Sequence, residues 1–156
     1  MNQMRRRTLG AGGGAGLLAL LTAAGIVGPG EVLAAARNKI AFDVKSVQDA
    51  LKSLGASGPA ASTDIMIRAA DIAENGAVVP VGVESKIPGT ESIAILVDKN
   101  PSPLAASFDI PAGTEPSVTT RVKMGQTSDV YALVKANGKY YMTKKEIKVT
   151  IGGCGG

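Results

Sequence analysis

The feature that most constrains the fold is an alternation of apolar and polar residues that recurs from residue 65 to the C-terminus. In each of several short segments, every second residue is apolar, commonly Val or Ile, and the residues between them are mostly polar or small. A period of two is typical of β-strands that bury one face. The expected strands cover residues 65–69, 79–84, 93–97, 104–110, 118–124, 130–135, 140–142 and 147–151.

Turn signals separate these segments at regular intervals. The clearest are Glu74-Asn75-Gly76, Pro88-Gly89 and Asn137-Gly138, and the last is a strong signal for a tight β-hairpin. Seven or so short strands with such turns predict a mainly β fold, an antiparallel two-sheet sandwich that is immunoglobulin-like in shape. Pro80 favours an edge position for the 79–84 strand, because proline has no N–H to donate within a sheet.

One segment before the strands has helical rather than alternating spacing. Val44, Val47, Leu51 and Leu54 recur at intervals of three and four residues, which predicts one short amphipathic helix over 43–54. Its start can be capped by Asp43 or by Ser46, and Gly55 fits its end. We expect its apolar side to pack against the β domain.

The N-terminus has the pattern of an export signal. Arg5-Arg6-Arg7 precedes an apolar, small-residue stretch over 10–28, and Ala34-Ala35-Ala36 supplies a cleavage site. Arg5 to Leu9 also resembles the twin-arginine pattern of exported bacterial proteins. A permanent membrane anchor is the alternative, but the stretch is rich in glycine and is interrupted by Pro29.

These observations divide the chain into three parts. We expect a cleaved signal at 1–36, a β-sandwich domain at 37–151 and a flexible C-terminal arm at 152–156, with the mature protein in the periplasm and not in a membrane. Of 17 Lys or Arg and 13 Asp or Glu, three arginines and one glutamate lie in 1–36, so the remainder has a net charge of only +2. Such a mild charge favours neither nucleic acid nor an anionic membrane surface as a partner.

The arm contains the one cysteine of the chain, Cys154, and glycines surround it: Gly152, Gly153, Gly155 and Gly156. Glycine adopts backbone conformations closed to other residues, so this segment can act as a thin, pliant tether for a thiol. An ordinary terminal tail is the alternative. However, exposed free thiols are generally avoided, and in an oxidising periplasm a lone sulfur must bond to something outside the chain.

The residue inventory argues against catalysis by this chain alone. The sequence has no histidine, which excludes Ser-His-Asp triads, Cys-His dyads and histidine-based metal sites, and one cysteine cannot build a thiolate metal site. We therefore expect no metal, no cofactor and no catalytic residue. Lys144, Lys145 and Lys148 are near Cys154 in sequence and would favour its thiolate weakly, although a solvated strand face explains them more simply. The pattern is that of a covalent carrier, with Cys154 as the attachment site and with activation supplied by partner enzymes.

The ending Val149-Thr150-Ile151-Gly152-Gly153-Cys154-Gly155-Gly156 closely resembles the C-terminus of SoxY, the sulfur carrier family of the periplasmic thiosulfate-oxidising (Sox) system. The export signal, the expected helix and the segment from Ala73 to Val81 resemble that family too. The resemblance implies that Cys154 carries sulfur intermediates on a swinging arm and that the chain forms a heterodimer with SoxZ. It also implies transient contacts with a c-type cytochrome that attaches thiosulfate, a hydrolase that releases sulfate and a sulfane dehydrogenase.

Two other functions compete with the carrier. An exported sandwich can use Cys154 for an intermolecular disulfide, as an adhesin or a linked dimer would. The terminal Gly155-Gly156 is also similar to that of ubiquitin-like sulfur carriers, which are activated at the carboxylate, but the export signal and the absence of a β-grasp helix placement argue against that class.

Overall fold

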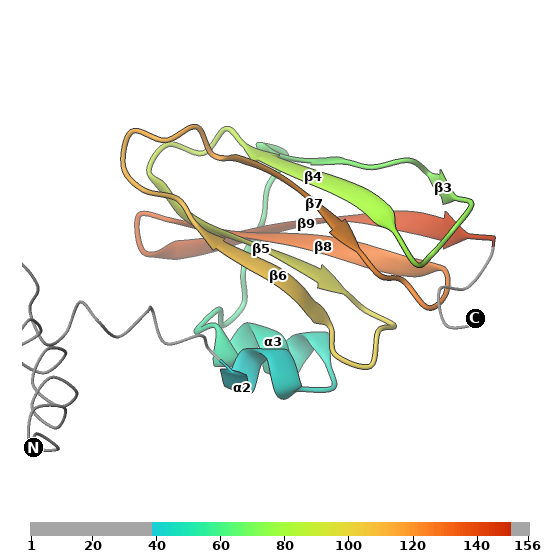
Figure 1. Cartoon of the computed structure of the whole chain (residues 1–156). Coiled ribbons are helices and arrows are strands. Elements are labelled where there is room, and N and C mark those ends of the chain that lie inside the picture. The colour runs from blue at the N-terminus through green and yellow to red at the C-terminus, as the bar shows by residue number, and fades with distance from the viewer. Residues whose placement is uncertain (1–38, 151–156) are drawn as a thin grey trace, which may run out of the picture. The chain divides into compact units, whose positions relative to one another are not determined.

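The computed structural model describes residues 39–150, and these form two stacked β-sheets with a pair of short helices (Figure 1). The helices are α2 (Lys39–Asp43) and α3 (Val47–Ser53). The strands are β1 (Ala60–Ala61), β2 (Ile65–Arg68), β3 (Ile72–Ala73), β4 (Val79–Ser85), β5 (Thr90–Val97), β6 (Leu104–Asp109), β7 (Ser117–Val122), β8 (Ser128–Ala136) and β9 (Lys139–Val149).

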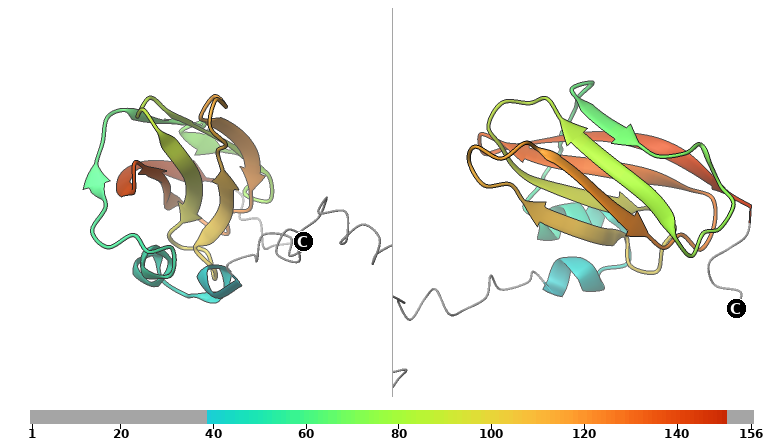
Figure 2. Two further views of the ribbon diagram at one scale, coloured as in Figure 1. Left: turned by 90° about the vertical axis from the view of Figure 1, so that its left-hand side faces the viewer. Right: turned by 45° about the horizontal axis from the view of Figure 1, so that its top comes forward.

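The larger sheet has the strand order β1-β9-β8-β5-β6, and the smaller sheet has the order β2-β4-β7. All ladders between the longer strands are antiparallel. The two-residue strands β1 and β3 both pair with β9 in parallel, β1 near its beginning and β3 at its end. The two sheets face each other in both views of Figure 2. The predicted mainly β sandwich is therefore confirmed.

The β8–β9 hairpin forms at the predicted Asn137-Gly138 turn. Ala136 pairs with Lys139, so Asn137 and Gly138 alone make the loop. Both have a left-handed backbone, with φ of 50° and 72°. A two-residue turn of this kind matches the right-handed twist of the strands that it joins. The hairpin makes β9, the strand that leads toward Cys154, a direct neighbour of the most buried part of the larger sheet.

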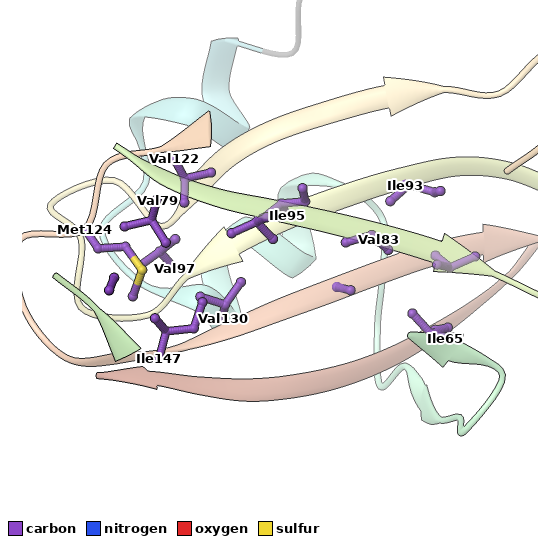
Figure 3. Close-up of a cluster of buried hydrophobic side chains, with 14 of the residues drawn as sticks. Ile65, Val79, Val83, Ile93, Ile95, Val97, Val122, Met124, Val130 and Ile147 are labelled. Carbon is purple, nitrogen blue, oxygen red and sulfur yellow. The ribbon is translucent and has the colours of Figure 1, made fainter. Parts of the chain in front are cut away.

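Branched aliphatic side chains fill the space between the sheets (Figure 3). The centre of this core is fully buried and includes Val81 and Val83 of β4, Ile93 and Ile95 of β5, Val130 of β8 and Ile147 of β9. Because alternate residues of a strand point to opposite faces, the other side of β5 needs a second cover. The helices supply it: Ala94 and Leu96 of β5 pack with Ala50 and Leu51 of α3. β5 is consequently buried on both faces.

The helical region differs from the single helix that was predicted over 43–54. The structure has two helices, because Asp43 ends α2 and Ser46 starts α3. Ser46 has an extended backbone, and its hydroxyl accepts the N–H of Asp49, which makes it the N-cap of a new helix. At the other end, Gly55 has a φ of 78° and the N–H of Ala56 bonds to the carbonyl of Leu51, closing a Schellman motif. The predicted stop at Gly55 is thus confirmed.

The expectation that Pro80 marks an edge strand is wrong, because β4 is the central strand of the smaller sheet. The missing N–H of proline, on which the expectation was based, is nevertheless accommodated locally. β2 pairs with β4 only as far as Gly82, so Pro80 has a strand partner on one side alone, at Arg121 of β7. The missing N–H of the proline therefore interrupts no ladder between β2 and β4.

Candidate functional site

The predicted attachment site lies outside the described residues. Cys154 and the four glycines of the expected arm fall within 151–156, and the predicted export signal falls within 1–38. What the structure does describe is the strand that leads to the arm, β9, up to the residue that follows it, Thr150.

The end of β9 is held on both of its edges. On one edge, the N–H of Thr150 donates to the carbonyl of Ala73 (3.1 Å), and the Thr150 hydroxyl donates to the carbonyl of Glu74 (3.2 Å). On the same edge, the N–H of Lys148 donates to the carbonyl of Asp71 (2.9 Å). On the other edge, the N–H of Val149 donates to the hydroxyl oxygen of Thr127 (2.9 Å). The folded domain therefore fixes the chain four residues before Cys154.

The segment that holds this edge, residues 71–76, is itself fixed to the sandwich. Asn75 accepts the N–H of Ala77 at its side-chain oxygen (2.8 Å), which closes the turn predicted at Glu74-Asn75-Gly76. The carbonyl of Gly76 then accepts the N–H of Met124, whose side chain is fully buried between the sheets. The clamp on β9, by which we mean residues 71–76 and Thr127, is thus anchored in the core.

Lys145 adds an ionic link to the same contact. Its ammonium group lies 2.9 Å from the carboxylate of Asp71 and 2.5 Å from the carbonyl of Ala69. The hydrogen bond with Lys145, followed by its charge, lowers the pKa of Asp71, and the charge of Lys148 adds a smaller effect in the same direction. Because Asp71 is largely exposed, the pair orients the segment more than it stabilises the fold.

Two of the three lysines near Cys154 in sequence, Lys144 and Lys145, are engaged within the domain. Lys144 pairs with Asp129 at 2.8 Å and lies 6.0 Å from the centre of the Tyr131 ring. The hydrogen bond and charge of Asp129 raise the pKa of Lys144. Together with the Lys145–Asp71 pair, this arrangement favours the strand-face explanation of Lys144 and Lys145 over a role in activating the thiol.

A shallow groove of about 360 Å³ lies beside the clamp, between the ends of β2 and β3 and the start of β4. Ile72 and Val78 line it with exposed fractions of 55% and 52%, and Pro80 lines it too. Sequence reasoning did not single out Ile72 or Thr127, and it included Val78 only as a member of a longer segment. The signal that pointed to this region was the segment from Ala73 to Val81, which the resemblance had singled out and which the fold places next to the end of β9.

Within 39–150, no three metal-binding side chains come together, and no helix combines the length and hydropathy needed to span a membrane. A larger surface groove, about 620 Å³ beside β1, is lined mainly by hydroxyl and apolar residues with Asp64 and Lys144.

Fold and site together define a small β-sandwich whose final strand leads to a cysteine-bearing C-terminal segment. The family model described as sulfur oxidation protein SoxY matches residues 50–154, a stretch that includes Cys154. The chain belongs to the SoxY family, the sulfur carriers of sulfur oxidation, and the predicted resemblance is confirmed.

A solved structure agrees with this assignment. The sulfur carrier protein SoxY from Chlorobium limicola f thiosulfatophilum is 43% identical over 68% of this chain and 97% of its own, with a TM-score of 0.62. A superoxide reductase (neelaredoxin) from Ignicoccus hospitalis is 21% identical over 55% of this chain and 78% of its own, with a TM-score of 0.48, which is too low to carry an argument. No curated protein sequence matches the chain.

Proposed function

We propose that this chain carries sulfur intermediates as covalent adducts on Cys154 and presents them to partner enzymes on the arm formed by residues 152–156. The observation that carries the proposal is the SoxY family match, which extends through Cys154. The clamp at Thr150 supports it, because a tether works best when its root is fixed and its reach begins at a defined point.

The chemistry at Cys154 balances with partners of the kind that the family implies. The thiolate and thiosulfate combine to a cysteine S-thiosulfonate, R–S⁻ + S₂O₃²⁻ → R–S–S–SO₃⁻ + 2e⁻, and a c-type cytochrome accepts the two electrons. A hydrolase then releases sulfate, R–S–S–SO₃⁻ + H₂O → R–S–SH + SO₄²⁻ + H⁺, and leaves a persulfide on the carrier. A sulfane dehydrogenase is the third enzyme that we expect the arm to visit.

In this division of labour the chain itself is not a catalyst. A thiol is a nucleophile only as its thiolate, and activation needs a nearby base or cation. Lys144 and Lys145 already pair with Asp129 and Asp71. We therefore assign activation of Cys154 to the partner enzymes.

The same proposal includes a location and a stable partner. We propose export to the periplasm after cleavage near Ala36, and a heterodimer with SoxZ. Sedimentation of the mature chain with and without SoxZ tests the partner. A single larger species is expected from the mixture, whereas two independent monomers at micromolar concentration would contradict the heterodimer.

Mass spectrometry tests the carrier function. The mature protein, incubated with thiosulfate and the purified partner enzymes, is expected to gain a mass on its Cys154 peptide that a reductant removes. The Cys154→Ser variant is the control and is expected to fold with an unchanged melting temperature and to gain nothing. Thiosulfate oxidation sustained by that variant would contradict the proposal. A disulfide-linked dimer as the sole product would favour the competing interaction function instead.

A further inference from the structure

The surface beside the end of β9 has the properties of a docking site for an enzyme. We propose that the arm-root surface, which we define as Ile72, Val78 and Pro80 around their groove, is where the rim of the active site that attaches thiosulfate to Cys154 contacts the carrier body. This inference rests on the proposed carrier function and assigns to it a recognition surface.

The length of the chain beyond Thr150 limits where such an enzyme can be. Cys154 is four residues further on, and four extended residues span at most about 14 Å. An active site that receives the sulfur must open within that distance of Thr150. The N–H of Thr150 is bonded to Ala73, the residue next to Ile72. The enzyme residues that surround the opening therefore lie close to this part of the carrier.

Half of the strongly exposed large apolar side chains of the described region lie where such an enzyme would contact the carrier. Only four large apolar residues within 39–150 are strongly exposed, and two of them, Ile72 and Val78, line the groove at the arm root. The other two are Ile40 of α2 and Met66 of β2. Small clusters of exposed apolar residues commonly mark interaction sites.

Two of the charges near the groove are compensated within the carrier, whereas the carboxylate of Glu74, which also lines it, has no ion pair among the described residues. Arg68, which lines it, lies 2.6 Å from the carboxylate of Glu84, and Lys145 lies 2.9 Å from that of Asp71. An enzyme surface that covers the groove therefore meets few uncompensated charges. We therefore assign to the rim an apolar character, and we expect the apparent KM for the carrier to depend only weakly on salt.

The clamp gives this surface a fixed relation to the tether. The segment that displays Ile72 and Val78 also supplies the carbonyls that hold Thr150, so docking there sets the origin of the arm relative to the active site. Figure 1 shows β3 at the end of the sandwich where β9 finishes. The helices lie on the face of the larger sheet that is turned away from the smaller sheet. A small apolar contact of this kind suits a carrier that must leave each enzyme after transfer.

Three charge substitutions test the surface. Ile72→Lys and Val78→Lys each remove an exposed apolar side chain and add one positive charge, and Ile40→Lys makes the same change in α2, on the helical layer. With the purified enzyme that couples thiosulfate to the thiol, the first two are expected to raise the KM for the carrier about tenfold with little change in kcat. Ile40→Lys is expected to behave as wild type. Val78→Thr, which keeps the shape without the charge, is expected to give a smaller rise in KM.

Two further measurements separate docking from its alternatives. The rate at which dithiobis(nitrobenzoate) reacts with Cys154 is expected to differ little among the variants, because a small reagent needs no docking and an added lysine favours the thiolate only weakly. Equal KM values for Val78→Lys, Ile72→Lys and wild type would overturn the docking site while leaving the carrier function intact. Altered sedimentation with SoxZ at an unchanged KM would assign the surface to the stable partner and also overturn it. A wild-type protein that gains no adduct would instead refute the carrier function, and the docking site with it.

Discussion

The hydroxyl oxygen of Thr127 accepts the backbone N–H of Val149 at 2.9 Å, so the loop before β8 holds the last residue of β9. Thr150 bonds to Ala73 and Glu74 on the opposite edge of the same strand. The tether of a carrier needs a defined origin, and these contacts from two distant parts of the sequence provide one immediately before the segment that contains Cys154.

Loss of the Thr127 hydroxyl should loosen this origin. Thr127→Val keeps the shape of the side chain but leaves the N–H of Val149 without its acceptor, at a cost of about 1 kcal/mol. We expect faster amide hydrogen exchange at Val149 and Thr150 and little change in the centre of β8. Thr127→Ser restores the hydroxyl and should restore protection. Unchanged exchange in the valine variant would show that the other edge alone holds the strand.

Two glycine substitutions should differ in their effect on stability. Gly89 and Gly113 both have a left-handed backbone, with φ of 71° and 82°. A Cβ at Gly113 would meet nothing within 4 Å, whereas a Cβ at Gly89 would lie 2.5 Å from the side-chain oxygen of Asn137. Asn137 cannot move freely, because its amide donates to the carbonyl of Pro88 (2.9 Å). Urea unfolding should show a loss of about 1 kcal/mol for Gly113→Ala and roughly 3 kcal/mol for Gly89→Ala. Equal losses would mean that the Asn137 contact is unimportant.

Acid should weaken the ionic link at the clamp. The folded-state pKa of Asp71 is lowered, mainly by its hydrogen bond with Lys145, so the link contributes its full stability above the ordinary carboxyl pKa of about 4. That contribution is lost as the pH falls through and below this value. Glu84 and Glu91 also have lowered pKa values, through Arg68 and Lys135, so the comparison must be with Asp71→Asn. Melting temperatures measured from pH 6 to pH 3 should fall slightly more for wild type than for the variant, and parallel curves would contradict the assignment.

A shorter tether should slow transfer without disturbing the fold. Deletion of Gly152 and Gly153 reduces the maximum reach of Cys154 by about 7 Å. We expect an unchanged melting temperature and slower enzymatic loading of Cys154, followed by mass spectrometry. Gly152→Ala with Gly153→Ala is the matched control, since it keeps the length and changes only the backbone freedom. Transfer at the wild-type rate in the deletion variant would refute the tether.

Local sequence patterns were sufficient for most of the longer strands and for one hairpin, but residues 140–142 and 147–149, expected in two separate strands, both belong to β9. Val79, Val81 and Val83 alternate because one side of β4 is buried, and Asn137-Gly138 adopts the two left-handed conformations that its residues tolerate. The split between α2 and α3 was missed, because Val44 and Val47 keep a helical spacing across the cap at Ser46. β1 and β3 were missed because two-residue strands have no period to detect.

The candidate site, too, was predictable from the sequence only in part. Cys154 and its glycines were recognisable in the sequence because their chemistry is local: one thiol with no second cysteine in the chain and four residues without side chains. The arm-root surface was not recognisable, since it joins Ile72 and Val78 to a strand end about 70 residues later. Exposure of an apolar residue is also invisible in a sequence, because Ile72 reads like any core isoleucine.

The sequence by itself determined the strand periods, the tightest turn, the absence of histidine and the placement of a single thiol among glycines. The tertiary structure decided that β4 is central, that helices cover the outer face of β5, and that residues 71–76 and Thr127 hold the end of β9. The physical reason is that period and turn chemistry act between neighbours in the chain. The pairing of β3 with β9 instead depends on how two sheets and their connections pack in space, which no local pattern encodes.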